Sequence, residues 1–318
     1  MKIAITGALG HIGSRLIHSL RPGDYSGVLL IDNLATRRRN ALFGLPAGVP
    51  FRFVEEDVLT ADLPRLFEGC DAVIHLAAIA DAGASYMRPE AVESVNYDGT
   101  LRVAEACRAT GAGLFFPSTA SVYAPSGALA RENGPESDIA PQTPYAVGKR
   151  RAELLLAEMG SQGLRYVIGR LGTVFGASPG MRFHTAVNRF VWQACMGQPV
   201  TVWRTAMEQR RPYLDVIDAA AAISFMMRRR AFDGTTRNLA TVGATVSDVL
   251  TVLRRRVPDL DARLVDAPAM NALSYDAPAE SLLREGFVFA GSLERGIGET
   301  VDLLRNARAN SFGAPESA

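Results

Sequence analysis

Short apolar runs alternate with helical patterns over the first half of the chain. The apolar runs are bounded by turn residues, which is typical of buried strands. They lie at 2–6, 28–32, 51–57, 72–78, 113–119 and 165–172, and the helical patterns between them lie at 11–20, 62–68, 89–110 and 144–159. Strands that alternate with helices predict βαβ units with right-handed crossovers. The expected fold is therefore α/β, a doubly wound parallel (Rossmann) sheet with helices on both faces.

The regular alternation of strands and helices ends after residue 172. Glycine and proline interrupt the pattern, strands become fewer, and helices are expected at 184–197, 217–230, 246–257 and 293–308. We therefore predict a doubly wound domain over 1–172 and a smaller C-terminal region over 173–318. Some segments of that region are expected to return to the sheet.

The composition argues against several classes of protein, namely those that bind nucleic acid, span a membrane, are secreted or bind a metal through cysteines. The chain has 318 residues, 48% of them hydrophobic, and a formal net charge of +1, so its charge favours neither a nucleic-acid nor a membrane partner. No run approaches the roughly 20 apolar residues of a membrane span, and the first residues lack a signal-peptide core. Three widely spaced cysteines, Cys70, Cys107 and Cys195, form no metal-ligand pattern and no disulfide framework. We expect a cytoplasmic protein without a metal site.

A glycine-rich turn follows the first strand. In "ITGALGHIGSRL", Gly7, Gly10 and Gly13 lie between a strand and a helix. Glycine permits a tight turn in that context, and the N–H groups at the helix N-terminus can bind a pyrophosphate. His11 and Ile12 belong to the same turn and are included in the predicted cofactor site.

A carboxylate ends the second strand, where it can bind an adenosine ribose. Asp32 in "LLIDN" lies about 20 residues beyond the glycines and is followed by Asn33. Because a carboxylate accepts hydrogen bonds from the ribose and repels a 2′-phosphate, we predict NAD rather than NADP. The arginines at 37–39 argue for NADP, but they lie beyond the strand end.

The stretch "PYAVGK" carries a second chemical signal. Tyr145 and Lys149 are about one helical turn apart, so their side chains lie on one face of a helix. An ammonium group favours the phenolate form of a neighbouring phenol, which lowers the phenol pKa and makes Tyr145 a usable proton acceptor. Taken alone, the pair also fits an exposed tyrosine and a solvated lysine.

These motifs and others in the same order resemble the extended short-chain dehydrogenase/reductase family, whose largest branch contains NAD-dependent nucleotide-sugar epimerases and dehydratases. The resemblance covers roughly residues 1–230. It rests on GxxGxxG at 7–13, "DNL" at 32–34, "EDV" at 56–58, "HLAA" at 75–78, "SYMRPEAVESVNYDGT" at 85–100, "PSTASVY" at 117–123, "PYAVGK" at 144–149, "GRLGTVFG" at 169–176 and "RRPYLDVID" at 210–218. It implies NAD as the cofactor and a nucleotide sugar as the substrate.

The resemblance also implies roles for individual residues. Tyr145 exchanges a proton with a sugar hydroxyl, Lys149 holds the nicotinamide ribose and lowers the phenol pKa, and Thr119 orients the same hydroxyl. Further cofactor contacts are implied for Asn33, Asp57, Val58, Leu76, Ala77, Ala78 and Asn96. Substrate contacts are expected from Ser85, Ser121, Thr173, Asn188, Arg204 and Arg211. Relatives often pair two helices per subunit, so a homodimer through the helices near 90–110 and 144–159 is expected.

The residues after Thr119 bear on the reaction. The 4,6-dehydratase branch carries an acid there, whereas this chain has Ala120 and Ser121. The cysteine of the 3,5-epimerising relatives is absent as well. We therefore expect a 4-epimerase that works through a transient keto-sugar. The alternatives are a keto-sugar reductase or dehydrogenase, an atypical dehydratase and, in a different class, a non-catalytic NAD-binding regulator. Ala80, Thr173 and the missing later "RpGD" element depart from standard UDP-galactose 4-epimerases.

Overall fold

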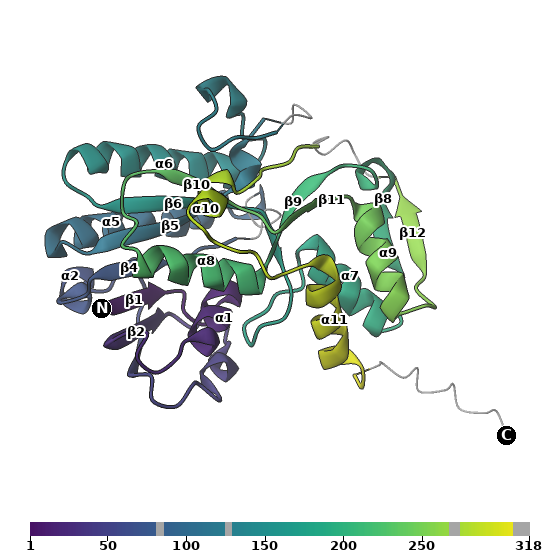
Figure 1. Ribbon diagram of the computed structural model, residues 1–318, viewed down its shortest axis with the longest axis horizontal. Coiled ribbons are helices and arrows are strands. Elements are labelled where there is room, and N and C mark those ends of the chain that lie inside the picture. The colour runs from purple at the N-terminus through teal and green to yellow at the C-terminus, as the bar shows by residue number, and fades with distance from the viewer. Residues whose placement is uncertain (81–85, 125–128, 267–273, 308–318) are drawn as a thin grey trace.

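A parallel seven-stranded sheet forms the centre of the protein (Figure 1). The computed structural model describes residues 1–80, 86–124, 129–266 and 274–307. The strand order is β10-β6-β5-β4-β1-β2-β3, and each neighbouring pair is parallel. The strands are β1 Lys2–Thr6, β2 Gly27–Asp32, β3 Phe51–Glu55, β4 Ala72–His75, β5 Gly113–Thr119, β6 Tyr166–Leu171 and β10 Thr236–Leu239. The predicted doubly wound parallel sheet is confirmed.

Helices cover both faces of this sheet, which explains why its strands are continuous apolar runs. Ile3 and Ile5 of β1 belong to one buried cluster and Ala4 belongs to the other, because successive side chains of a strand point to opposite faces. The first cluster includes side chains of α1 His11–Ser19, α8 Val216–Arg228 and α10 Glu280–Arg284. The second includes side chains of α2 Leu63–Phe67, α5 Gly99–Thr110 and α6 Pro144–Ser161.

A third buried cluster forms the C-terminal region, which lies beside the main sheet in Figure 1. It is built on α7 Ala186–Cys195, α9 Val246–Arg256 and α11 Leu293–Leu304. Its two small sheets are β11-β9-β7 and β12-β8, with β7 Thr173–Phe175, β8 Val200–Trp203, β9 Arg211–Asp215, β11 Val242–Ala244 and β12 Ala262–Val265.

Two details differ from the sequence-based expectations. The expectation of fewer strands after residue 172 is wrong, because β7 to β12 all lie there. They are too short to show a clear period-two pattern. The predicted helix over 89–110 is divided into α4 Pro89–Glu93, a one-turn π-helical stretch Ser94–Asp98 and α5. The domain boundary at 172 stays a prediction, since β10 and α8 from beyond it complete the main sheet and one of its helical layers.

No helix in the described part of the chain is long and apolar enough to cross a membrane.

Candidate active site

A cavity of about 520 Å³ opens at the carboxyl edge of the main sheet, which is where doubly wound folds bind their ligands. Its volume lies in the usual range for small-molecule sites. Residues at or just after the ends of β1, β2, β4 and β5 line it. The predicted site residues that line the cavity are Gly7, Gly10, His11, Ile12, Gly13, Asp32, Asn33, Asp57, Val58, Leu76, Ala77, Ala78, Thr119, Ser121, Tyr145, Lys149, Thr173 and Arg211.

The glycine-rich turn brings two strand ends together. Gly7 has a φ of +64°, and a Cβ atom there would lie 2.5 Å from the backbone nitrogen of Ala77. Only glycine fits this contact, because the conformation and the space both exclude a side chain. Helix α1 begins at His11, directly after the turn, so its first N–H groups lie at the cavity wall. This cradle fits a dinucleotide pyrophosphate.

Asp32 is held rigidly at the adjacent wall. One carboxylate oxygen accepts a hydrogen bond from the Leu9 N–H over 3.0 Å, and the other accepts one from the Leu34 N–H over 2.9 Å. Beside it, the Asn33 side-chain amide donates to Asp57 over 2.8 Å. These fixed acceptors fit the hydroxyl groups of an adenosine ribose.

A loop from the C-terminal region crosses over the glycine-rich turn. We call residues 177–182 the strap. The backbone N–H of Gly180 donates to the Ser14 hydroxyl over 2.9 Å, and the Ser178 hydroxyl lies 3.1 Å from Nδ1 of His11. The side chain of Asn40 donates to the carbonyl oxygen of Pro179 over 3.0 Å. The strap is thereby tied to the first helix and to the segment after β2.

Helix α6 places the tyrosine and the lysine on the opposite wall. The Thr143 hydroxyl accepts a hydrogen bond from the Ala146 N–H, and Pro144 occupies the first turn, so the helix begins just before Tyr145. One turn later, the buried ammonium group of Lys149 donates to the carbonyl oxygen of Pro117 over 2.8 Å. The structure therefore brings Thr119, Tyr145 and Lys149 to one cavity.

The electrostatics of this pair correct one expectation. Burial lowers the pKa of Lys149 to about 8, against the opposing charge of Glu153. Burial also raises the pKa of Tyr145, and the charge that opposes this rise is that of Arg182, not of Lys149. The expectation that Lys149 lowers the Tyr145 pKa is therefore not met in this structure, because desolvation dominates.

Sequence reasoning missed a buried ionic network behind the site. The carboxylate of Glu153 accepts hydrogen bonds from Ser118 over 2.5 Å and from Arg170 over 3.0 and 2.7 Å. Burial opposes ionisation of Glu153, but the hydrogen bonds and charge of Arg170 hold its pKa below the usual value. The network joins α6 to β5 and β6. The helical spacing could have identified Glu153, since it lies four residues after Lys149 and eight after Tyr145, on the same helix face.

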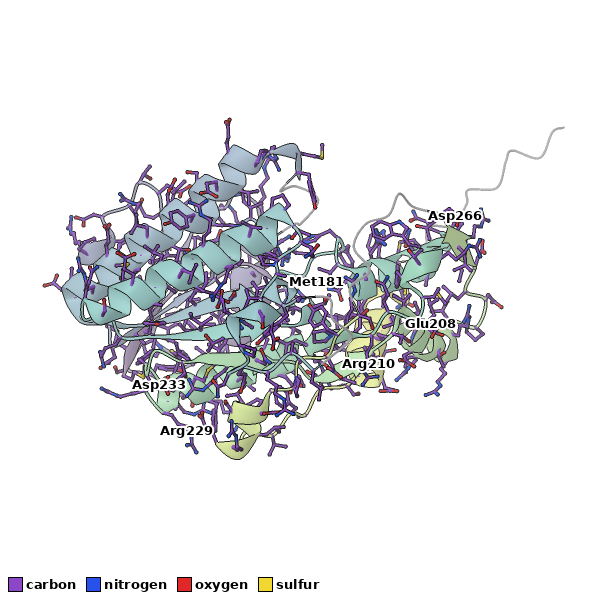
Figure 2. All side chains as sticks on the ribbon, turned by 90° about the horizontal axis from the view of Figure 1, so that it is seen from above. Met181, Glu208, Arg210, Arg229, Asp233 and Asp266 are labelled. Carbon is purple, nitrogen blue, oxygen red and sulfur yellow. The ribbon has the colours of Figure 1, made fainter. Side chains whose placement is uncertain are left out.

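Three predicted contact residues do not line the cavity. The side-chain amide of Asn96 donates to the carbonyl oxygen of Ile79 and accepts from the Ile79 N–H. It therefore fixes the segment after β4 without itself lining the cavity. The buried amide of Asn188 accepts from the Gly176 N–H and donates to the carbonyl oxygen of Arg182. Arg204 pairs with Asp266, which Figure 2 shows at the outer edge of the C-terminal region. Ser85 lies outside the described residues.

Several lining residues were absent from the predicted site. Among them are Arg38, after β2, and Arg182 and Thr185, in the strap and three residues after it. No periodic pattern marks these loop positions. Among the described residues, no cluster of histidine, cysteine and carboxylate side chains could hold a metal ion.

A model of the NAD-dependent epimerase/dehydratase family matches residues 3–240. The chain belongs to this family. It is 33% identical to an uncharacterized UDP-glucose epimerase of Bacillus subtilis over 264 residues, which span 80% of either chain. It is 32% identical to a UDP-glucose 4-epimerase of Azospirillum brasilense over 70% of this chain and 66% of that one.

A solved structure agrees with these relatives. The Thermus thermophilus UDP-glucose 4-epimerase, solved with NAD, is 28% identical and superposes with a TM-score of 0.82 over 96% of this chain and 100% of that one. The predictions of an NAD-dependent enzyme of the extended nucleotide-sugar epimerase/dehydratase family, and of NAD as its cofactor, are confirmed.

Proposed function

We propose that the protein is an NAD-dependent nucleotide-sugar 4-epimerase with Tyr145 as its acid and base. One observation carries the proposal. Thr119, Tyr145 and Lys149 line the same cavity as the glycine-rich turn and Asp32, so proton transfer and cofactor binding occur at one place. Residues from both sides of position 172 line it, among them Asp32, Thr173 and Arg211. Asp32 is proposed to bind the cofactor, and Thr173 and Arg211 the substrate.

The cofactor and the side chains divide the chemistry. NAD, when bound by the glycine-rich turn and Asp32, accepts a hydride from the sugar carbon and returns it. Tyr145 takes the proton of the sugar hydroxyl and gives it back. The Thr119 oxygen already accepts a hydrogen bond from the Ser121 N–H over 3.1 Å, which leaves its own hydrogen to donate to the sugar oxygen. Lys149 supplies a buried positive charge in the same cavity.

The distribution of carboxylates favours epimerisation over dehydration. Among the lining residues that the structure describes, the carboxylates are Asp32, Glu56 and Asp57. Asp32 ends β2, and Glu56 and Asp57 directly follow β3, on the part of the cavity proposed to bind the adenosine. Ala120 and Ser121 follow Thr119, so no acid stands beside it to eliminate water.

The strap supports epimerisation over net reduction. An epimerase has to keep its cofactor until the hydride has returned to the sugar, whereas a reductase exchanges its cofactor in each cycle. Hydrogen bonds from the strap to Ser14, His11 and Asn40 cross the glycine-rich turn. These contacts brace the turn, and we propose that a braced turn releases a bound dinucleotide more slowly.

The nucleotide sugar is proposed to be a UDP-sugar, because the relatives named above are UDP-glucose epimerases. Arg211 lines the cavity and is held by the side chain of Gln209 over 3.2 Å. An arginine there suits a diphosphate, which it can bind with two N–H groups.

A turnover screen tests the proposal. The purified protein is mixed with NAD and with UDP-, GDP-, CDP- and dTDP-sugars, while nicotinamide absorbance and sugar proton NMR are followed together. A new epimer without a net absorbance change, absent with Tyr145→Phe, is the expected result. A lasting gain or loss of reduced cofactor would mean a dehydrogenase or reductase. A lack of turnover with every sugar would refute the catalytic proposal.

A further inference from the structure

A chain of buried polar residues lies behind the segment that follows β4. Thr6 ends β1 and His75 ends β4, and the two are opposite each other in the parallel register. Thr100 lies in α5, and Asn96 lies in the π-helical stretch before it. All four residues are at most 3% exposed, and none of them is among the described residues that line the cavity. Any effect that they have on a bound ligand must therefore pass through the residues that do line it.

The surroundings of His75 keep its ring neutral. The ring stacks on Phe116 with centroids 6.4 Å apart, and the ammonium group of Lys149 lies 4.5 Å from the centre of the same Phe116 ring. A second buried cation at His75 would be repelled by this ammonium group. Burial and the Lys149 charge together lower the pKa of His75 to about 3. His75 is therefore a fixed hydrogen-bonding group near neutral pH rather than an acid or a base.

The hydrogen bonds of a neutral His75 have one consistent direction. The Thr100 hydroxyl donates to the backbone carbonyl oxygen of Asn96 over 2.7 Å, which uses its single hydrogen. At its 3.2 Å contact with Nε2 of His75 it can then only accept, so Nε2 carries the hydrogen of the ring. Nδ1 is left as an acceptor, and the Thr6 hydroxyl donates to it over 2.8 Å. The Thr6 oxygen accepts the N–H of Ala77 over 3.3 Å, so each hydrogen of the chain is used once.

Both ends of the chain hold the segment that lines the cavity after β4. Ala77 and Ile79 belong to that lining. Thr6 holds the Ala77 N–H at one end, and the side chain of Asn96 bonds to both backbone groups of Ile79 at the other. Gly7 packs closely against this segment, since a Cβ atom there would lie 2.5 Å from the Ala77 nitrogen. A shift of the segment is therefore transmitted to the glycine-rich turn.

We propose that His75 is a positioning residue for NAD, which ties Thr6 of β1 to Thr100 of α5 with its hydrogen on Nε2. Without the imidazole, the buried Thr6 hydroxyl loses its acceptor, and the two ends of the chain are no longer connected. The segment from Ala77 to Ile79 is then less ordered, and ordering it costs free energy when a ligand binds against it. NAD binding needs no sugar, so the proposal does not depend on the proposed epimerisation.

Nitrogen-15 NMR of the NAD-loaded wild type tests the direction of the hydrogen bonds without any substitution. The chain has four histidines, and the signals of His75 are the ones that His75→Phe lacks. The expected ring at pH 7 is neutral, with its hydrogen on Nε2. A hydrogen on Nδ1, or on both nitrogens, would overturn the assignment, because the chain from Ala77 to Asn96 could not then run as described.

The release of NAD from the loaded protein tests the positioning role. His75→Phe and Thr100→Val both break the chain, and NAD should dissociate from each about 10-fold faster than from the wild type in stopped-flow fluorescence. Thr300→Val is the matched control. Like Thr100, Thr300 is a buried helical threonine that donates to the carbonyl oxygen four residues earlier, that of Gly296, over 2.8 Å, but it lies in α11. It should lose similar stability in urea and keep the wild-type rate of NAD release.

A double variant tests whether the two side chains act as one chain. His75→Phe with Thr100→Val should release NAD no faster than the faster single variant, because both substitutions remove the same link. Multiplied effects would mean that the two residues act separately and would overturn the proposal. Wild-type release from folded His75→Phe would overturn it as well, and so would equal effects of Thr100→Val and Thr300→Val. If His75→Phe fails to fold, this last comparison and the ring tautomer still decide the matter.

Discussion

The ammonium group of Lys149 lies 2.8 Å from the carbonyl oxygen of Pro117, the residue two positions before Thr119. The same ammonium group lies 4.5 Å from the centre of the Phe116 ring. Strand β5 therefore surrounds the lysine with one hydrogen-bond acceptor and one aromatic face, and Lys149 is only 3% exposed. Lys149 is one of two lysines in a chain that otherwise uses arginine. Lysine, unlike arginine, readily changes its pKa when buried.

This burial makes stability depend on pH in a defined window. The pKa of Lys149 is lowered by burial from 10.5 to about 8. Between these values the unfolded chain binds more protons than the folded one, so this group's contribution to the free energy of unfolding rises with pH. Lys149→Met lacks that contribution. The stability of the wild type relative to the variant should increase by up to about 3 kcal/mol from about pH 8 to about pH 10.5.

Urea unfolding at both ends of this window measures the difference. Lys2→Met is the control, because Lys2 reaches the carbonyl oxygen of Glu68 in an exposed position. Its stability relative to the wild type should change little over the same range. A Lys149→Met curve that runs parallel to the wild-type curve would contradict a lowered lysine pKa.

Glu153→Gln is expected to destabilise the fold strongly. The substitution leaves the buried guanidinium of Arg170 without its ionic partner, and breaking a buried pair in this way costs about 3–5 kcal/mol. The pKa of Glu153 is low despite burial, because Arg170 stabilises the carboxylate. The stabilisation is present above the ordinary carboxyl pKa and is lost as the pH falls through the folded value, so the difference between wild type and variant should shrink in acid.

Denaturant unfolding across acidic pH measures this change. The double variant Glu153→Met, Arg170→Met removes both charges and should recover much of the lost stability. If the double variant were as unstable as the sum of the two single variants, the two side chains would not be coupled as a pair.

Local pattern was sufficient to predict the strands and the residues at their ends. Gly7 directly follows β1, and Asp32 and Thr119 end β2 and β5. All three lie at the same edge of a parallel sheet, so the order of elements alone brings them together. Tyr145 and Lys149 follow from one helical spacing. The positions of these residues in the site follow from short-range chain geometry, which can be predicted from the spacing of residues in the sequence.

Loop paths explain what the sequence did not predict. The strap binds Ser14, which is 166 positions earlier than Gly180, and no local pattern reports such a contact. Asn188 looked like a substrate contact, but its amide closes the strap instead. Asn96 lies in a π-helical stretch, and its side chain bonds to the backbone of Ile79 rather than lining the cavity.

Asp32→Asn should change the cofactor preference. The substitution keeps the shape of the side chain and removes the charge that repels a 2′-phosphate. Arg38 also lines the cavity beside Asp32 and can then meet that phosphate. NAD affinity should fall about 10-fold or more, with a gain in NADP affinity. Fluorescence titration with both cofactors measures this, and Asp32→Asn with Arg38→Ala should lose the gain. Unchanged NAD affinity in Asp32→Asn would refute the assignment of Asp32 to the ribose.

Gly180→Ala should loosen cofactor binding through the strap. A Cβ atom at Gly180 would lie 2.2 Å from the carbonyl oxygen of Leu9, which is backbone and cannot swing aside. The strap therefore has to move away from the glycine-rich turn. Dissociation of NAD, followed by stopped-flow fluorescence, should become about 10-fold faster or more. Gly148→Ala is the control, because nothing lies within 4 Å of an added Cβ there and alanine favours the helix. Equal dissociation rates in wild type and Gly180→Ala would show that the strap does not retain the cofactor.

Leu154→Glu should dissociate the proposed homodimer. Val147 and Leu154 are 42% and 52% exposed, and their seven-residue separation on α6 puts both on one helix face. Such a stripe is expected to pack against a second copy of the chain, and a carboxylate at its centre would be buried without a partner. Light scattering should give a dimer for the wild type and a monomer for the variant. Leu283→Glu, at an equally exposed position on α10, lies on the opposite helical layer and should remain a dimer. A monomeric wild type would refute the dimer, and a dimeric Leu154→Glu would place its interface elsewhere.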